Sequence, residues 1–419
     1  MIGRWCAAAA AVIGTMVIGS PVATAEPDFY QPPPTLPGAA GDLIRTESMP
    51  LVWQAGAFPA KATRIMYRSN DTHGSANAVT GTFFDPAVPW SGPGPRPLVS
   101  LAPGTQGQGD QCAPSKTMGT VLSYTPPSNV VASYEVLFVN ALLSRGISVV
   151  VTDYEGLGTP GVHTYVNRAA EAHALLDAAR AAKQLPGTGI TPDGPVALWG
   201  YSQGGGASAA AVELQPEYAP ELDLRGAYAG APPADLAATL EQIDGTILTG
   251  AIGYTLNGIE QAYPEARPMI EEQLNDRGRQ MLADVANQCV GETRLKYGFQ
   301  RTSSFTRTGE SLSVVTARYP LATELFAEQR IGNRTPKAPV LIESGIHDDL
   351  VPFGQARQLA DDWCAKGSTV QFSENLLPPV DPGAGINHAA PYPLGTPEAL
   401  TWITDRFSGV PAPSNCRMR

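Results

Sequence analysis

The hydrophobic positions of the chain fall into short runs separated by longer stretches with helical spacing. Eight short runs are mainly apolar and β-branched, which favours strands with little exposed surface. These runs are 64–69, 78–84, 98–101, 148–151, 196–199, 224–229, 340–343 and 369–373. Between several of them the apolar residues recur at helical intervals, most clearly over 169–183. The alternation predicts an α/β fold whose predominantly parallel sheet is buried on both faces.

The alternation breaks between Pro233 and Gly332, where no run resembles a strand. Apolar residues recur at helical spacing over 243–259 and again over 269–285, so we expect an all-helical insertion. It divides the core into a first part, 26–232, and a second part, 333–419. The first helix contains glycines, which weaken it: Gly245, Gly250, Gly253 and Gly258. Two interpretations remain open, a cap packed firmly on the core or a mobile lid that presents apolar surface to substrate.

The N-terminus has the layout of a secretory signal peptide. One basic residue, Arg4, precedes an apolar stretch from Cys6 to Ile18, and the small-residue pattern ending at Ala25 follows. We expect residues 1–25 to be removed near Ala25 and the mature protein to be secreted. No later run of apolar residues is long enough to span a bilayer, so no integral membrane segment is predicted.

Charge and cysteine content further limit the class of protein and the compartment in which it resides. With 39 acidic and 28 basic residues the chain lacks the basic surplus of a nucleic-acid binder. Cys6 leaves with the signal peptide, and Cys112, Cys289, Cys364 and Cys416 remain for two disulfides in an oxidising compartment. The count alone leaves all three pairings open. No zinc-ligand spacing is present, and neither a metal nor a cofactor is expected.

A candidate nucleophile lies in Gly200-Tyr201-Ser202-Gln203-Gly204. The serine follows a predicted strand and precedes a helical stretch, which is the context of a nucleophile elbow. In such a turn the serine backbone is strained and its neighbours pass close together, so side chains at Gly200 and Gly204 would collide. The pattern predicts a reactive Ser202.

Ser202 needs a base oriented by a carboxylate. The five histidines are His73, His163, His173, His347 and His388. His388 follows the last predicted strand and so fits the order Ser, acid, His, whereas His173 is expected on a helix surface. Asp348 and Asp349 follow the preceding strand. Asp348 is preferred because it stands in the Gly-x-x-Asp-x-x-Val-Pro phase, and Asp349 is expected to face solvent or to cap the loop.

Two backbone amides must stabilise the oxyanion of the tetrahedral intermediate. We expect the first to be that of Gln203, directly after the nucleophile. The second comes from the glycine-containing loop 101–107, with Thr105 preferred and Gly104 as the alternative. Pro103 has no amide proton and is excluded.

With these residues in place, the chain resembles the secretory lipase family of the Candida antarctica lipase A type, and more closely its actinobacterial branch. The blocks that carry the resemblance are 102–105 with 112–115, Asp153 to Gly161, Gly200 to Gly205 and His347 to Pro352. The resemblance implies an α/β-hydrolase fold with a large helical cap before the acid strand and a triad of Ser202, Asp348 and His388. It also implies the pairings Cys112–Cys289 and Cys364–Cys416. Because 102–105 departs from the yeast motif, details of the oxyanion hole are not transferred.

These features together predict a secreted serine hydrolase that cleaves acylglycerols or other lipid esters through an acyl-enzyme on Ser202. Its partner would be a lipid or ester molecule, with transient contact to a lipid interface through the cap. Three alternatives are a short-chain carboxylesterase, an acyltransferase and a non-catalytic binding module on the same fold. The last would require a broken triad.

Overall fold

The computed structural model describes residues 28–52, 60–125 and 129–416. The predicted signal peptide and its cleavage site lie outside the described residues. All eight predicted strands are present within the described part, each within a few residues of its expected bounds. The polar edge strand β1 and the small hairpin β5–β6 lack an apolar run and were not predicted.

One sheet of nine strands organises the described chain. Its order is β1 (Leu43–Met49), β2 (Ala60–Asn70), β3 (Ala76–Pro86), β7 (Ser148–Thr152), β4 (Leu98–Ala102), β8 (Val196–Tyr201), β9 (Leu224–Gly230), β10 (Val340–Gly345) and β11 (Val370–Asn375). The strands from β7 to β11 run parallel, whereas β1, β2, β3 and β7 pair antiparallel. The fold is therefore the mainly parallel α/β-hydrolase arrangement that the sequence predicts.

Helices cover both faces of this sheet because the strand side chains alternate between two apolar clusters. One face packs against α3 (Arg168–Ala182), α4 (Gln203–Tyr218) and α12 (Phe353–Ala365). The other face packs against α2 (Glu135–Leu143) and α14 (Pro391–Phe407). In β7, Val150 belongs to the first cluster and its neighbours Val149 and Val151 to the second. The continuous apolar runs of the sequence thus reflect burial on both sides.

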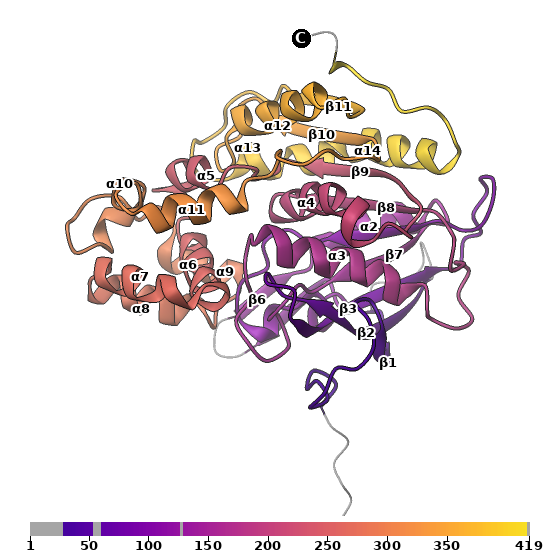
Figure 1. The fold of residues 1–419 in the computed structure, drawn as a ribbon, viewed down its shortest axis with the longest axis horizontal. Coiled ribbons are helices and arrows are strands. Elements are labelled where there is room, and N and C mark those ends of the chain that lie inside the picture. Colours follow the sequence, from indigo (N-terminus) through magenta and orange to yellow (C-terminus); the bar gives the residue numbers. More distant parts are fainter. Residues whose placement is uncertain (1–27, 53–59, 126–128, 417–419) are drawn as a thin grey trace, which may run out of the picture.

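Between β9 and β10 every named element of the described chain is helical. They are α5 (Leu236–Ile243), α6 (Ala251–Ala262), η3 (Pro264–Ala266), α7 (Arg267–Gln273), α8 (Asp276–Val285), α9 (Val290–Tyr297), η4 (Thr302–Ser304), α10 (Leu312–Thr316) and α11 (Pro320–Gln329). Figure 1 shows these helices gathered at one end of the molecule, beside the sheet. The chain then returns to the sheet as β10 and β11.

Glycines shape the first part of this helical segment. Gly245, with φ +87°, lies in the break that separates α5 from α6, so the single helix expected from residue 243 is two helices. Inside α6, a side chain at Gly253 would come within 2.8 Å of Val285, and one at Gly258 within 3.0 Å of Tyr165. These two glycines allow α6 to pack closely against α8 and against the core.

Short elements lie around the loop that follows β4: η2 (Asp110–Cys112), α1 (Pro114–Thr117), β5 (Leu122–Thr125), β6 (Asn129–Ala132) and, near the C-terminus, α13 (Ile386–Ala389). Disulfides join Cys112 to Cys289 and Cys364 to Cys416, the pairings that the resemblance implies. Beside the first, the Val290 amide donates to the Gln106 carbonyl at 2.8 Å. The loop after β4 is therefore tied to the helical segment by a disulfide and by backbone hydrogen bonds.

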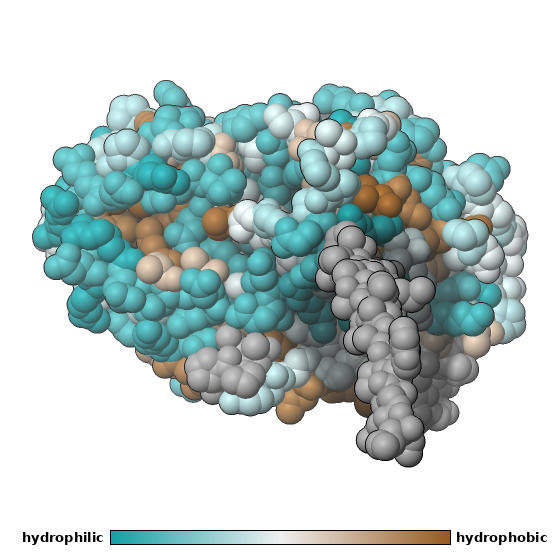
Figure 2. All heavy atoms as spheres, turned by 90° about the horizontal axis from the view of Figure 1, so that it is seen from below, coloured by the Kyte–Doolittle hydropathy of each residue, from teal (hydrophilic) through white to brown (hydrophobic). Residues whose placement is uncertain are grey.

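The surface in Figure 2 is mostly hydrophilic, and a hydrophobic hollow framed by hydrophilic residues opens at the helical end. Among the described residues no helix is both long and apolar enough to cross a bilayer.

Candidate active site

Ser202 occupies the sharp turn between β8 and α4, with φ +59° and ψ −123°. A side chain at Gly200 would come within 2.0 Å of the Gly204 carbonyl oxygen, and one at Gly204 within 2.0 Å of the Ala102 carbonyl oxygen. Both contacts are far closer than non-bonded atoms allow. The two glycines therefore permit the strained turn, as the sequence predicts for a nucleophile elbow.

His388 lies on α13, and each of its two ring nitrogens has a hydrogen-bond partner. Its Nε2 is 2.8 Å from Ser202 Oγ, and its Nδ1 is 2.8 Å from Asp348 Oδ2. The hydroxyl of Tyr201 donates to the His388 carbonyl at 2.7 Å, which fixes the backbone of α13 against the elbow. The structure thus brings together the three residues of the predicted triad across 186 positions of sequence.

The two neighbouring aspartates hold different parts of His388. Asp348 faces the ring, and its other oxygen accepts the amides of Leu350 and Val351, each at 2.9 Å. Asp349 is buried and does not face solvent; it accepts the amides of Gly385 at 2.8 Å and His388 at 3.1 Å. Of the two roles expected for Asp349, capping is the one observed, and the loop that it caps is the one that carries the histidine.

These carboxylates set the proton affinity of the imidazole. Burial lowers the pKa of His388, but the charge and hydrogen bond of Asp348 and the charge of Asp349 outweigh it, so the net pKa is raised above 6.5. An imidazolium beside Ser202 is thereby stabilised. That is the property a general base needs when it takes the serine proton.

The loop after β4 faces Ser202 from the other side. The Gly104 amide donates to Glu135 Oε1 at 2.8 Å, so Gly104 is already bonded and is not available as an oxyanion donor. Glu135 is buried on α2 and also accepts from the Tyr392 hydroxyl; burial raises the pKa of its carboxyl to about 7, against those hydrogen bonds. Thr105 lines the same pocket as Ser202 and remains the candidate second donor.

A buried network that the sequence reasoning missed holds the side chain of Gln203. Its amide nitrogen donates to Glu171 Oε1 at 2.7 Å and to His163 Nε2 at 2.9 Å. His163 Nδ1 lies 3.0 Å from the Glu155 carbonyl, so the ring is neutral and donates there; burial lowers its pKa to about 4. Burial also raises the pKa of the Glu171 carboxyl to about 8. The network orients the residue whose backbone amide follows the nucleophile.

His173 differs from its expected place. It is buried, its ring stacks on Tyr218 with centroids 4.1 Å apart, and Nδ1 lies 3.2 Å from the Asp71 carbonyl. Helix α3 packs against both the sheet and α4, so the face taken for a surface is covered.

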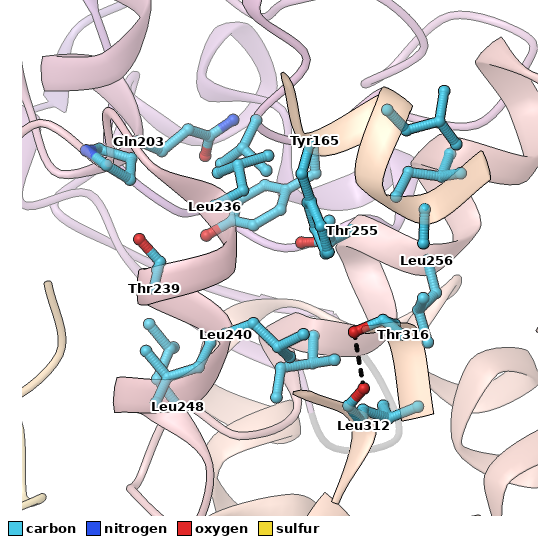
Figure 3. Close-up of a pocket in the computed structure, with 18 of the residues that line it drawn as sticks. Tyr165, Gln203, Leu236, Thr239, Leu240, Leu248, Thr255, Leu256, Leu312 and Thr316 are labelled. Carbon is cyan, nitrogen blue, oxygen red and sulfur yellow. Dashed lines mark hydrogen bonds between the residues drawn. The ribbon is translucent and has the colours of Figure 1, made fainter. Parts of the chain in front are cut away.

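An apolar pocket, here called the acyl pocket, runs from Ser202 and Gln203 into the space between the core and helices α5, α6, α7, α10 and α11. The space within its walls is about 980 Å³, part of it open to solvent. Figure 3 shows Gln203 at one end, Leu312 and Thr316 at the other, and leucines between them.

None of the described residues that line the acyl pocket is charged, and its threonine hydroxyls already have partners. Thr239, Thr255 and Thr316 each donate to a backbone carbonyl of their own helix or its cap. The Tyr165 hydroxyl bonds to Thr105 Oγ1 at 2.7 Å. The pocket therefore presents carbon surface and satisfied polar groups, which suits a hydrocarbon chain.

A second pocket, here called the alcohol pocket, lies on the other side of Ser202. It shares Ser202, Leu248 and Leu350 with the acyl pocket, and it alone includes His388 and Thr105. Among the described residues, no group of three or more His, Cys, Asp and Glu side chains is arranged to hold a metal ion. A serine paired with a histidine and an aspartate, between two pockets, is equipped for acyl transfer.

The family model described as secretory lipase matches residues 124–415 of the chain. The chain belongs to the secretory lipase family. It is accordingly a secreted, lipase-like ester hydrolase, and the actinobacterial likeness inferred from the sequence is supported by a relative from Mycobacterium tuberculosis.

That relative, named "Probable inactive lipase", is 30% identical over 93% of this chain and 84% of its own length. Lipase 10 of Candida albicans is 29% identical over 93% of this chain and 82% of its own. Among solved structures, Candida antarctica lipase A in its closed state aligns with a TM-score of 0.75 and 25% identity, over 90% of this chain and 84% of that one. The secretory lipase fold thus extends over nearly the whole described chain.

Proposed function

We propose that Ser202, His388 and Asp348 are the catalytic triad and that the enzyme hydrolyses lipid esters whose acyl chain occupies the acyl pocket. The observation that carries the proposal is the hydrogen-bonded series from Ser202 Oγ through His388 to Asp348 at the mouth of an uncharged apolar pocket. Acylglycerols are the substrate class that fits both the pocket and the family.

In the proposed mechanism His388 takes the proton of Ser202 as Oγ attacks the ester carbonyl. The amides of Gln203 and Thr105 stabilise the oxyanion, and the alcohol leaves with the proton from His388. Water then attacks the acyl-enzyme by the same route, and the carboxylic acid is released. Asp348 holds the imidazole in the tautomer that accepts at Nε2 and stabilises its charged form.

The test compares wild type and Ser202→Ala on p-nitrophenyl esters of increasing chain length and on triacylglycerol emulsions. Ser208→Ala is the matched control, since Ser208 lies on α4, the helix that follows Ser202, and its hydroxyl donates to the Tyr228 carbonyl. We expect Ser202→Ala to lose at least 10³-fold in kcat. Hydrolysis that persists in this variant would overturn the mechanism.

The acyl pocket is tested with Leu240→Trp, because Leu240 lies midway along the pocket in Figure 3 and is half-buried. The indole ring of tryptophan is larger than the leucine side chain and shortens the pocket, so kcat/KM falls for long-chain esters and is retained for acetate esters. Equal loss on both esters would place the acyl chain elsewhere. A profile that peaks at short soluble esters would favour the carboxylesterase alternative, and ester products formed with an added alcohol would favour the acyltransferase.

A non-catalytic binding protein is the second candidate, because the Mycobacterium tuberculosis relative carries the name "Probable inactive lipase". Binding of lipid without any turnover by wild type would favour it. The intact spacing of Ser202 and His388 argues for activity.

The helical segment 233–332 is proposed to act as a cap over the acyl pocket, which it lines, and to contact the lipid interface when substrate enters. We also propose that the signal peptide is cleaved after Ala25. N-terminal sequencing of the exported protein tests the cleavage, with Glu26 as the expected first residue.

A further inference from the structure

The alcohol pocket differs from the acyl pocket in charge. Among the described residues that line it, one is an Arg or Lys, Arg294 on α9, and none is an Asp or Glu, whereas those lining the acyl pocket include none of the four. Both pockets meet at Ser202. An ester held at the nucleophile therefore extends into two environments, one neutral and one with a cation.

Arg294 is exposed and no ion pair among the described residues includes it. Lys296, two residues along the same helix, pairs with Asp284 at 2.5 Å. The charge of Arg294 also acts on Tyr134, another residue of the alcohol pocket: burial and the charge of Glu135 raise the pKa of that phenol, and Arg294 lowers it. Arg294 thus acts on the pocket interior, not only on solvent.

Several carboxyls bond to residues that line this pocket. Asp348 and Asp349 hold His388 and Gly385, and Glu135, which is buried, is bonded to Gly104 and Tyr392. Burial raises the pKa of the Glu135 carboxyl to about 7, and its charge opposes that of Arg294 at Tyr134. Its oxygens are engaged with Gly104 and Tyr392, and within the described part of the chain it forms no ion pair with Arg294. The open side chain of Arg294 therefore remains able to attract an anion.

The mechanism decides which part of the ester meets Arg294. His388 must give its proton to the leaving oxygen, and His388 lines the alcohol pocket but not the acyl pocket. The leaving alcohol consequently lies on the side of His388 and Thr105, where α9 forms part of the wall.

We propose that Arg294 binds an anionic group on the alcohol part of the substrate, so that the enzyme favours esters whose leaving alcohol carries a negative charge. This inference rests on the proposed function. The anion takes no part in the bond changes: the Ser202 Oγ–carbon bond forms, the carbon–oxygen bond to the alcohol breaks, and His388 protonates the alcohol. Arg294 is a specificity residue that acts through charge.

Two chromogenic esters with the same acyl chain provide the test, p-nitrophenyl butanoate and m-carboxy-p-nitrophenyl butanoate. They differ by one ring carboxylate on the leaving group. The variants are Arg294→Ala, Arg294→Lys and Arg294→Glu, with Lys296→Ala as the matched control on the same helix. Thermal unfolding checks that each variant folds.

For Arg294→Ala we expect kcat/KM on the carboxylated ester to fall about three- to fivefold, mainly through KM, as for an exposed ion pair. The neutral ester should change little. The ratio of kcat/KM on the carboxylated ester to that on the neutral ester should fall further in Arg294→Glu and be mostly retained in Arg294→Lys. Added salt should lower this ratio for wild type but not for Arg294→Ala.

Equal changes on both esters, or no change on either, would overturn the inference. If wild type hydrolyses both esters and only Ser202→Ala abolishes the reaction, the proposed function stands even when the role of Arg294 fails. Anionic esters of phosphate-bearing and carboxylate-bearing alcohols, compared in the same variants, then distinguish which anion Arg294 prefers.

Discussion

At the scale of single residues, the histidine loop is set by two acids with separate tasks. Asp348 bonds to the imidazole, and Asp349 bonds to the backbone amides of Gly385 and His388. Both raise the pKa of His388 through their charge. Asp349 is therefore a positioning residue whose loss should affect the pH dependence as well as the rate.

Asp349→Asn tests this role. The general base must be neutral, so activity is lost as pH falls through the pKa of His388, and the raised pKa places that acid limb above pH 6.5. Removing one carboxylate lowers the pKa, so the limb of kcat/KM against pH moves to lower pH by up to about one unit. The exposed Asp193→Asn is the control. A lower rate with an unmoved limb would leave Asp349 a purely structural role.

Glu171→Gln tests the buried network that holds the side chain of Gln203. Burial raises the pKa of Glu171 from 4.5 to about 8, so above pH 4.5 the unfolded chain loses this proton before the folded one. The free energy of unfolding of wild type should fall as pH rises from about 5 to 8, relative to Glu171→Gln. Urea unfolding at several pH values measures this, with the exposed Glu217→Gln as control. Parallel curves for wild type and Glu171→Gln would contradict it.

The sequence predicted the residues of the proposed triad but not the buried glutamates that bond to the loops around it. Ser202, Asp348 and His388 lie in local patterns next to strand ends, so the fold's chain order identifies them. Glu135 and Glu171 bond to partners 31 and 32 positions away. A buried glutamate on a helix has no local pattern that separates it from a surface one, and only the packing of α2 and α3 reveals these contacts.

At the scale of elements, close backbone approach decides where glycine is needed. Gly204→Ala would place a methyl group 2.0 Å from the Ala102 carbonyl, between α4 and β4. We expect the unfolding free energy to fall by about 1–3 kcal/mol and the activity to fall with it. Gly354→Ala on α12 is the control, since no atom of the described part of the chain lies within 4 Å of the added carbon. Equal stability of the two variants in urea would be inconsistent with the packing described.

The sequence predicted those helices and strands that have a clear hydrophobic pattern and missed those that have none. Strands buried on both faces are apolar along their length and were found, whereas β1 is a polar edge strand and left no such signal. In the helical segment, periodicity located α6 and α8 but not the break at Gly245, because spacing does not distinguish a weakened helix from two short ones.

At the scale of the whole molecule, the two disulfides have different neighbours. Cys112–Cys289 joins the loop after β4 to the helical segment, and Cys364–Cys416 ties the C-terminal segment to α12. Replacing either pair by alanine should cost about 2–5 kcal/mol of stability. Only loss of Cys112–Cys289 should also lower kcat, because it loosens the loop that carries Thr105. Equal kcat in the two double variants, measured well below their unfolding temperatures, would show that the Cys112–Cys289 bond has no effect on catalysis.

The Cys112–Cys289 bond also closes a covalent ring between residues 177 positions apart, and this ring contains the nucleophile elbow and helices α5, α6, α7 and α8. A single peptide bond cut by a protease anywhere inside that ring leaves the two pieces joined in one molecule. For a secreted enzyme that meets foreign proteases, such a nick removes no part of the chain, and it becomes visible as two fragments only after reduction.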